Sequence, residues 1–243
     1  MAFDGVCSKT MSEPPTPTDR ELRSFGRRHG RKFSAAQDRL LTEDLPRLAV
    51  DLGATVPVPL AGLFASPVRD VWLEIGFGGG EHLLWQAQHH PNVGIIGCEP
   101  YLDGVVKVLS AIQSKKLDSV RLHTDDARPL LRWLPPASLS RAFILFPDPW
   151  PKARHRKRRL VSPSLVASLA RVMMSGAELR LATDIGDYAR TALQALCASP
   201  EFFWRASSPE DWRIRPEDWP STRYEAKAVA AGRRCIYLTF VRR

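Results

Sequence analysis

Short apolar segments alternate with helical segments from Arg69 onward, and this alternation most constrains the fold. The apolar segments have the length and residue types of buried strands; they cover residues 71–75, 93–98, 119–123, 141–146 and 177–183. Helical patterns begin at Glu81 and Tyr101 and recur near 162–174 and 186–198. Strands that alternate with helices form βαβ units with right-handed crossovers. The sequence therefore predicts a doubly wound α/β fold with a mostly parallel sheet.

The C-terminal part predicts an addition to this sheet. Two β-rich pieces, FFWRA after Pro200 and Arg233–Val241, are separated by a polar loop that contains Trp and Pro. This pattern is typical of an antiparallel hairpin at a sheet edge.

The N-terminal part predicts an extension. Residues 1–20 are rich in Pro, Ser and Thr and have no hydrophobic periodicity, so we expect a disordered tail. Residues 21–67 should form a basic arm, with a helix from residue 35 to Pro46 and a Pro-rich connector. The α/β domain would then cover residues 68–243.

The charge of the chain favours phosphate-rich partners. The 243 residues include 35 Lys and Arg against 26 Asp and Glu, which gives a net charge of +9. No apolar run approaches the roughly 18 residues of a membrane span, and the N-terminus lacks the pattern of a signal peptide. We therefore expect a cytoplasmic protein with no membrane partner. The cysteines lack metal-site spacing, so we expect reduced thiols and no metal; they are Cys7, Cys98, Cys197 and Cys235.

A glycine-rich segment follows the first predicted strand, at the place where open α/β sheets bind ligands. Gly76 and Gly78 would allow close approach of a ligand. Glu74 lies inside the strand end, where a dinucleotide fold needs no carboxylate, and a cationic amino-acid group such as the methionine ammonium of S-adenosylmethionine (SAM) would explain it. Glu99, after the second strand, could accept hydrogen bonds from ribose hydroxyls. That role is shared with nicotinamide-dependent proteins, so it indicates a nucleoside only.

Two further acids follow the third predicted strand. Asp125 and Asp126 could contact an adenine amino group, and one of them could equally cap the next helix. Both uses can coexist.

The segment FPDPWPKARHRKRR, which begins at Phe146, joins a fixed carboxylate to a dense cationic run. Pro147 and Pro149 restrict the backbone on both sides of Asp148, and Trp150 offers a face for stacking a base. The alternatives are a Pro-rich turn with a capping Asp, and a nuclear localisation signal for the basic run. The position behind the ligand crevice favours contacts to substrate phosphates.

The chain resembles the bacterial tRNA (guanine-N7-)-methyltransferases of the TrmB type from about Arg23 to Phe240. The motifs that carry the resemblance are, in order, LEIGFGGGEHL, GCEPYLDGV, FPDPWPKARHRKRR, ATDIGDY and TRYEAKA. The resemblance implies a Rossmann-like SAM-dependent methyltransferase domain over residues 68–243 and methyl transfer from SAM to nitrogen 7 of guanine 46 in the variable loop of tRNA. The protein could be a monomer or a homodimer.

The resemblance also implies roles for single residues. Asp148 takes the active-site position and contacts the cofactor, together with Glu74, Glu99 and Asp126. These contacts add to the cofactor-binding role expected of the loop glycines Gly76 and Gly78 from their place after the first strand. The implied substrate contacts are Lys152, Asp184, Thr222, Arg223, Tyr224 and Glu225. The implied RNA contacts are Arg154, His155, Arg156, Lys157, Arg158 and Arg159.

Three other functions stay open on the sequence. Methylation of an exocyclic amine or an amide also uses an Asp-Pro-aromatic turn after the fourth strand, although those enzymes prefer two prolines after the acid. A non-catalytic RNA-binding module would not need Glu74, Glu99 and Asp148 together. A nicotinamide-dependent enzyme would lack a constellation for hydride transfer here.

Overall fold

The computed structural model describes residues 28–30 and 32–243. The tail predicted for residues 1–20 lies outside the described residues, and so do Arg23, Arg27 and Arg31 of the predicted basic arm.

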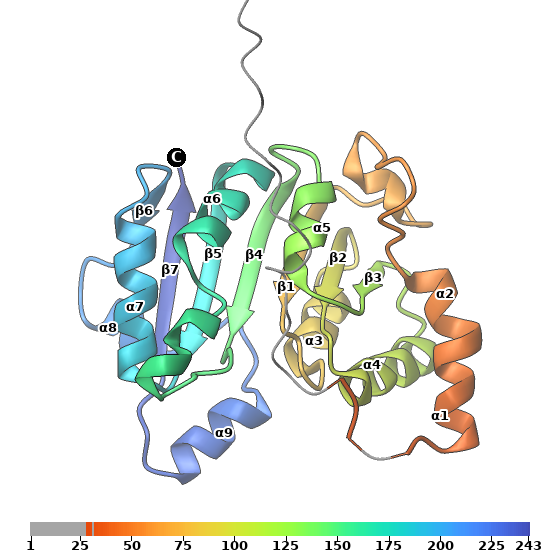
Figure 1. The fold of residues 1–243 in the computed structure, drawn as a ribbon. Coiled ribbons are helices and arrows are strands. Elements are labelled where there is room, and N and C mark those ends of the chain that lie inside the picture. Colours follow the sequence, from red (N-terminus) through yellow and green to blue (C-terminus); the bar gives the residue numbers. More distant parts are fainter. Residues whose placement is uncertain (1–27, 31) are drawn as a thin grey trace, which may run out of the picture.

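The described residues form a seven-stranded sheet in the order β3-β2-β1-β4-β5-β7-β6 (Figure 1). Its strands are β1 Asp70–Ile75, β2 Val93–Cys98, β3 Val120–His123, β4 Leu139–Leu145, β5 Met173–Thr183, β6 Phe202–Trp204 and β7 Ile236–Arg242. Strands β1 to β5 are parallel, and β7 pairs antiparallel with both β5 and β6. The predicted doubly wound sheet and its C-terminal antiparallel hairpin are therefore confirmed.

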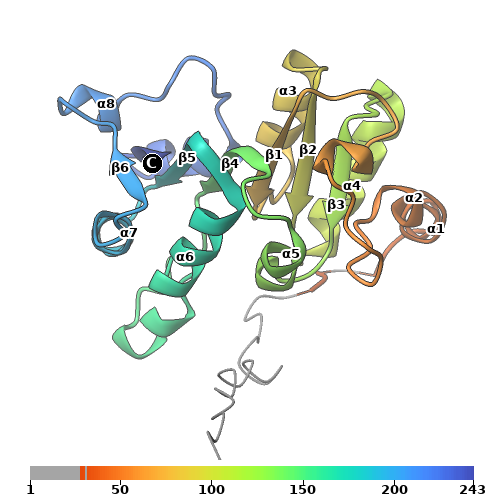
Figure 2. The same ribbon diagram turned by 90° about the horizontal axis from the view of Figure 1, so that it is seen from above.

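Helices cover both faces of the sheet, with α5, α6 and α7 along one side (Figure 2). The helices beside the parallel strands are α3 Glu81–His89, α4 Leu102–Lys115, α5 Ala127–Trp133, α6 Pro163–Val172 and α7 Gly186–Cys197. Along the chain, the short helix α8 Glu210–Arg213 and then α9 Arg223–Ala230 connect β6 to β7. Alternate residues of β1 enter two apolar clusters: Leu73 packs with residues of α5, α6 and α7, and Trp72 packs with residues of α3, α4 and α9. The continuous apolar character of the strands follows from this double burial.

Two of the differences from the predicted boundaries have a structural cause. Strand β5 begins at Met173 because the chain re-enters the sheet directly after α6 and pairs with Leu139. The N-terminal helix continues past Pro46, through α1 Ala35–Arg39, a π-helical turn at Leu40–Asp44 and α2 Leu45–Leu48. Pro46 lies in the first turn of α2, where the missing N–H is not needed. Two 3₁₀ segments, η3 Leu60–Leu63 and η4 Ala153–Arg158, complete the described elements.

Candidate active site

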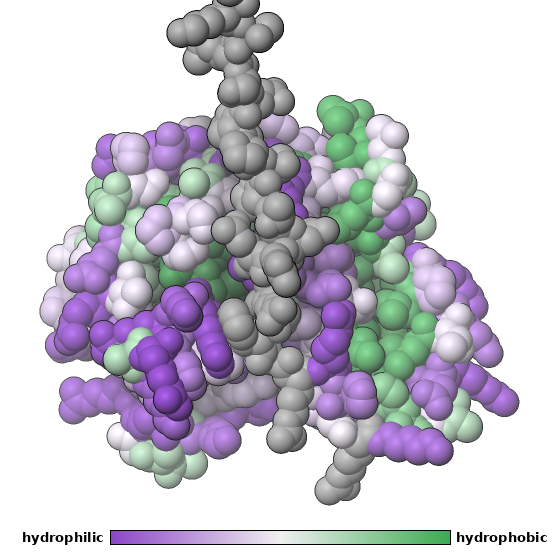
Figure 3. Space-filling model, in the orientation of Figure 1, coloured by the Kyte–Doolittle hydropathy of each residue, from purple (hydrophilic) through white to green (hydrophobic). Residues whose placement is uncertain are grey.

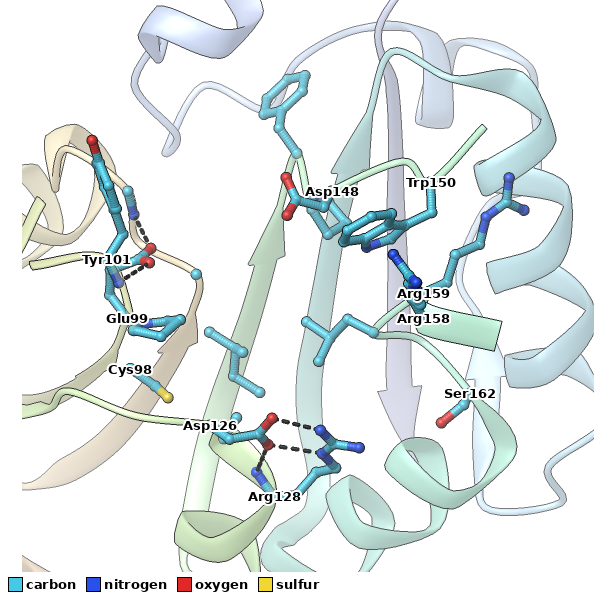
Figure 4. A pocket seen from close by; sticks show the side chains of 18 of the residues that line it. Cys98, Glu99, Tyr101, Asp126, Arg128, Asp148, Trp150, Arg158, Arg159 and Ser162 are labelled. Atoms are coloured by element: carbon cyan, nitrogen blue, oxygen red, sulfur yellow. Dashed lines mark hydrogen bonds and ion pairs between the residues drawn. The ribbon is translucent and has the colours of Figure 1, made fainter. Parts of the chain in front are cut away.

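A cavity of about 540 Å³ opens at the carboxyl ends of β1, β2 and β4. The strand order reverses at β1, which has β2 on one side and β4 on the other, so the cavity lies at the switch point of the sheet. Figure 4 shows Glu99 and Tyr101 on one side of it and Trp150, Arg158 and Arg159 on the other. The predicted residues that line it are Gly76, Gly78, Glu99, Asp125, Asp126, Asp148, Trp150, Lys157, Arg158, Arg159 and Tyr224.

The glycine loop that follows β1 is packed from two sides. Gly78 has a φ of +55°, and a Cβ there would lie 3.0 Å from the ring of Tyr224. On the other side, a Cβ on Gly104 of α4 would lie 2.0 Å from the carbonyl oxygen of Gly78. Gly78 therefore allows the backbone conformation of the loop, and Gly104 allows α4 to approach the loop closely.

Glu99, at the carboxyl end of β2, is held by hydrogen bonds from the backbone. Its two carboxylate oxygens accept hydrogen bonds from the N–H groups of Gly78 at 2.8 Å and Tyr101 at 2.9 Å. Burial raises the pKa of Glu99 against the effect of these two bonds, and the charges of Asp148 and Glu74 raise it further. Each carboxylate oxygen can accept a second hydrogen bond, so a buried acceptor for ligand hydroxyls faces the cavity.

The two acids after β3 have different partners. Asp126 is the N-cap of α5 and also forms a bidentate pair with Arg128, at 2.8 and 2.6 Å. The helix-cap interpretation is thus confirmed for Asp126. Asp125 forms an ion pair with Arg28 at 3.0 Å. Burial opposes ionisation of Asp125, but the hydrogen bonds from Arg28 and the Asp126 amide outweigh it and lower its pKa.

Asp148 lies on a strained turn. Phe146 and Trp150, on either side of Pro147-Asp148-Pro149, have positive φ values of 50° and 41°. Left-handed conformations cost bulky residues free energy and cluster at functional sites. Asp148 lines the cavity, and within the described residues no hydrogen bond or ion pair engages its carboxylate. The turn therefore presents an available anion to whatever enters the cavity.

The basic run divides into an exposed part and a buried part. Lys152, Arg154, Arg156 and Lys157 are exposed, and in Figure 3 hydrophilic side chains gather over the part of this face where η4 lies. The Arg158 guanidinium lies over the Trp150 ring, 5.0 Å from its centroid, and the ring of half-buried His155 meets the same indole edge-on.

Arg159, by contrast, is buried among protein partners. Its guanidinium donates to the carbonyl of Pro149 at 3.0 Å, to Thr191 Oγ1 at 2.7 Å and to the Asp187 carboxylate at 2.6 Å. These bonds tie the Asp148 turn to α7. This placement differs from the expected phosphate contact, because its charge is already paired inside the protein.

Five predicted residues outside the basic run do not line the cavity and have protein partners. Glu74 is 2 % exposed and hydrogen-bonds His82 Nδ1 at 2.7 Å. Asp184 pairs with Arg233 at 2.6 Å. Thr222 caps α9 by accepting from the Glu225 amide.

Glu225 itself is buried and accepts from Tyr237 at 2.8 Å and from Arg215 at 3.0 Å. Arg223 and Tyr224, which lie between Thr222 and Glu225 in the sequence, face the glycine loop. Arg223 pairs with Glu81, and the Tyr224 ring lies against Gly78. The first turn of α9 therefore brings this segment beside the cofactor end of the sheet.

Two residues of this region are not among the predicted site residues. Tyr101 lines the cavity beside Glu99, and its position two residues after the acid was the available signal. His82, eight residues after Glu74, lies within the glycine-rich motif, but nothing in the sequence pairs it with that carboxylate.

Among residues 28–30 and 32–243, no helix is long and apolar enough to cross a membrane. In the same part of the chain no group of His, Cys, Asp and Glu side chains comes together as a metal site. Cys98, Cys197 and Cys235 are free thiols.

The chain is similar to known methyltransferases. Residues 68–238 match the family described as "Putative methyltransferase". Three bacterial proteins named tRNA (guanine-N(7)-)-methyltransferase match most of the chain. The protein of Chelativorans sp. is 47 % identical and covers 90 % of this chain and 94 % of its own length. That of Rhodospirillum rubrum is 48 % identical, with 95 % and 91 % covered, and that of Rhodopseudomonas palustris is 49 % identical, with 90 % and 87 % covered.

Two solved structures resemble the fold. TrmN from Thermus thermophilus is 16 % identical over 84 % of this chain and 53 % of its own, with a TM-score of 0.52. The antibiotic-resistance methyltransferase Kmr is 16 % identical over 73 % of this chain and 88 % of its own, with a TM-score of 0.50. Both likenesses concern the Rossmann-like fold. By its motifs, its fold and its relatives, the chain belongs to the TrmB family of tRNA (guanine-N7-)-methyltransferases.

Proposed function

We propose that this protein transfers the methyl group of SAM to nitrogen 7 of guanine 46, in the variable loop of tRNA, in the bacterial cytoplasm. The observation that carries the proposal is the Asp148 carboxylate, which no described residue engages, on a strained turn between a nucleoside-type pocket and an exposed cationic segment. The relatives' names supply the reaction and the tRNA substrate.

The residues of the cavity, and Glu74 at the strand end beside it, fit SAM. Glu99 has acceptor capacity left for ribose hydroxyls. The glycine loop allows the ligand to approach the protein backbone closely, and Asp126 lines the cavity as a candidate contact for the adenine amino group. Glu74, a buried carboxylate beside Gly76, is matched in charge to an ammonium group. When bound, SAM supplies a methyl group activated by its sulfonium centre.

For this reaction the protein must position the guanine and compensate the positive charge that develops on it. Guanine nitrogen 7 carries a lone pair and no proton, so no general base is needed to create the nucleophile. We assign Asp148 to the N–H edge of the guanine, where its negative charge offsets the positive charge that develops on the purine. Trp150 offers an aromatic face, with Arg158 stacked on it, for a base drawn out of the folded RNA.

The surface around the cavity suits RNA. The exposed cations Lys152, Arg154, Arg156 and Lys157 would contact phosphates, which position the substrate. The implied contacts at Asp184 and at Thr222–Glu225 would act from the end of β5 and from the start of α9. We assign Arg159 to the support of the Asp148 turn, since its donors are used within the protein. Residues 68–243 would form the methyltransferase domain and residues 21–67 a basic arm.

Incubation with labelled SAM and tRNA, followed by chemical cleavage at 7-methylguanine, tests the proposal. The wild-type protein should modify guanine 46, and a tRNA with adenine at that position should not react. Asp148→Asn should lower turnover by about a hundredfold or more while the melting temperature stays unchanged. Methylation of an exocyclic amine, or wild-type turnover by Asp148→Asn, would remove the assignment.

A further inference from the structure

A buried chain of hydrogen bonds runs from the end of β1 to the loop before α9. Glu74 Oε2 lies 2.7 Å from His82 Nδ1, and His82 Nε2 lies 3.1 Å from Gln86 Nε2. Gln86 Nε2 donates in turn to the backbone carbonyl of Asp218 at 2.9 Å. Glu74, His82 and Gln86 are each at most 2 % exposed as whole residues. Water therefore cannot replace a missing partner in this series of hydrogen bonds.

The Asp218 carbonyl determines the direction of every bond in the chain. A carbonyl can only accept, so the NH₂ group of Gln86 must face it. The second hydrogen of that NH₂ points to His82 Nε2, which must then be the acceptor nitrogen of the ring. The ring proton is left on Nδ1, where it donates to Glu74.

The reversed orientation of the Gln86 amide is energetically less favourable. Reversal of the Gln86 amide would place its oxygen against the Asp218 carbonyl, with two acceptors facing each other across a buried contact. The observed orientation leaves Gln86 Oε1 without a partner, which is the smaller cost. A doubly protonated His82 would need this reversed amide, since its Nε2–H would otherwise face an N–H donor.

The neutral ring leaves the charge of Glu74 uncompensated. The Glu74 side chain is 3 % exposed, and in the described part of the chain His82 is the group that hydrogen-bonds it. A buried carboxylate with one neutral donor is costly unless a cation reaches it. Gly76, two residues further along, lines the cavity, so the cation can come from the ligand.

We propose that His82 is a positioning residue, whose neutral Nδ1-protonated ring aims the anionic Glu74 carboxylate at the ammonium group of the cofactor's amino-acid end. The ring itself is restrained by Phe143 at 4.5 Å and Trp219 at 5.9 Å between ring centroids. Trp219 and Asp218 belong to the loop that leads to α9, so this loop also determines the tautomer of His82. The inference rests on the proposed use of SAM.

Ligand binding to two His82 variants tests the proposal. The ligands are S-adenosylhomocysteine, which carries the ammonium group, and 5′-methylthioadenosine, which lacks the amino-acid part. His82→Leu should bind the first ligand about tenfold more weakly or worse and the second within about twofold of wild type, measured by titration calorimetry. His82→Asn places an amide N–H near the position of Nδ1 and should restore much of the lost affinity.

A purely structural role for His82 would weaken both ligands equally in His82→Leu, and that result would overturn the proposal. An unchanged affinity for S-adenosylhomocysteine, or a His82→Asn protein no better than His82→Leu, would overturn it as well. Long-range ¹H–¹⁵N spectra of wild-type protein with labelled histidine provide a measurement that needs no variant. They should show a protonated Nδ1 and an unprotonated Nε2; two protonated nitrogens or the reverse pattern would refute it.

The outcomes also separate this inference from the proposed function. A protein that discriminates the two ligands through His82 but makes no 7-methylguanine in tRNA would remove the proposed function alone. A protein that methylates guanine 46 but shows no discrimination would remove this inference alone.

Discussion

Replacement of Arg159 by alanine should destabilise the protein more than any other change in the basic run. The Arg159 side chain is 2 % exposed, and its guanidinium joins Pro149, Thr191 and Asp187. Its removal leaves the Pro149 carbonyl without this donor and the Asp187 carboxylate with only its exposed partners, Arg156 and Arg190.

The magnitude follows from these contacts. Breaking a buried ion pair costs about 3–5 kcal/mol. The Asp187 side chain is 37 % exposed, so water and Arg156 can stabilise its carboxylate after Arg159 is removed, which reduces this free-energy cost. We therefore expect a loss of about 2–3 kcal/mol in the free energy of unfolding, which lowers the melting temperature by roughly 5–10 °C for a chain of this size. Turnover should also fall, because the turn that carries Asp148 loses its tie to α7.

Lys157→Ala is the matched control. Lys157 is exposed, so its removal should change stability by less than about 0.5 kcal/mol. It should instead reduce the slope of log affinity for tRNA against log salt by about 0.7–0.9 if it contacts one phosphate. Urea unfolding and filter binding across a salt series measure the two effects separately. An Arg159→Ala protein with wild-type stability and a reduced salt slope would refute the division of the basic run.

Three further changes test other parts of the structure. Because burial raises the pKa of Glu99, its carboxylate form is lost on acidification at a higher pH than for an ordinary glutamate; SAM affinity by calorimetry should fall through that range, and Glu99→Gln should bind weakly without this dependence. Gly104→Ala should cost about 1–3 kcal/mol and weaken SAM binding, since the new Cβ would meet the Gly78 carbonyl; an unchanged urea midpoint would contradict the close approach of α4. Arg28→Ala should change the thermal stability by less than about 1 kcal/mol, because the ion pair with Asp125 joins two half-exposed side chains; a larger loss would mean that the arm is part of the core.

The sequence alone determined the sheet and the place of the site. Apolar runs of strand length, separated by helical periodicity, favour a parallel sheet with helices on both faces, and the structure has such a doubly wound sheet. The glycine turn after β1, Glu99 after β2 and Asp148 after β4 then meet of necessity, because the carboxyl ends of parallel strands lie at one edge. These conclusions need only local pattern and chain direction.

Only the tertiary structure decided which charges are available to a ligand. Arg154 and Arg159 look alike in the basic run, yet Arg154 is exposed and Arg159 pairs with Asp187, a residue 28 positions further along. Glu74 at the end of β1 and Asp148 after β4 are both acids near the carboxyl ends of strands, yet Glu74 is buried against His82 while Asp148 stays available. The cause is that hydrophobic periodicity specifies which face a residue takes, whereas the pairing of two polar groups depends on distances of a few ångströms between segments distant in the chain.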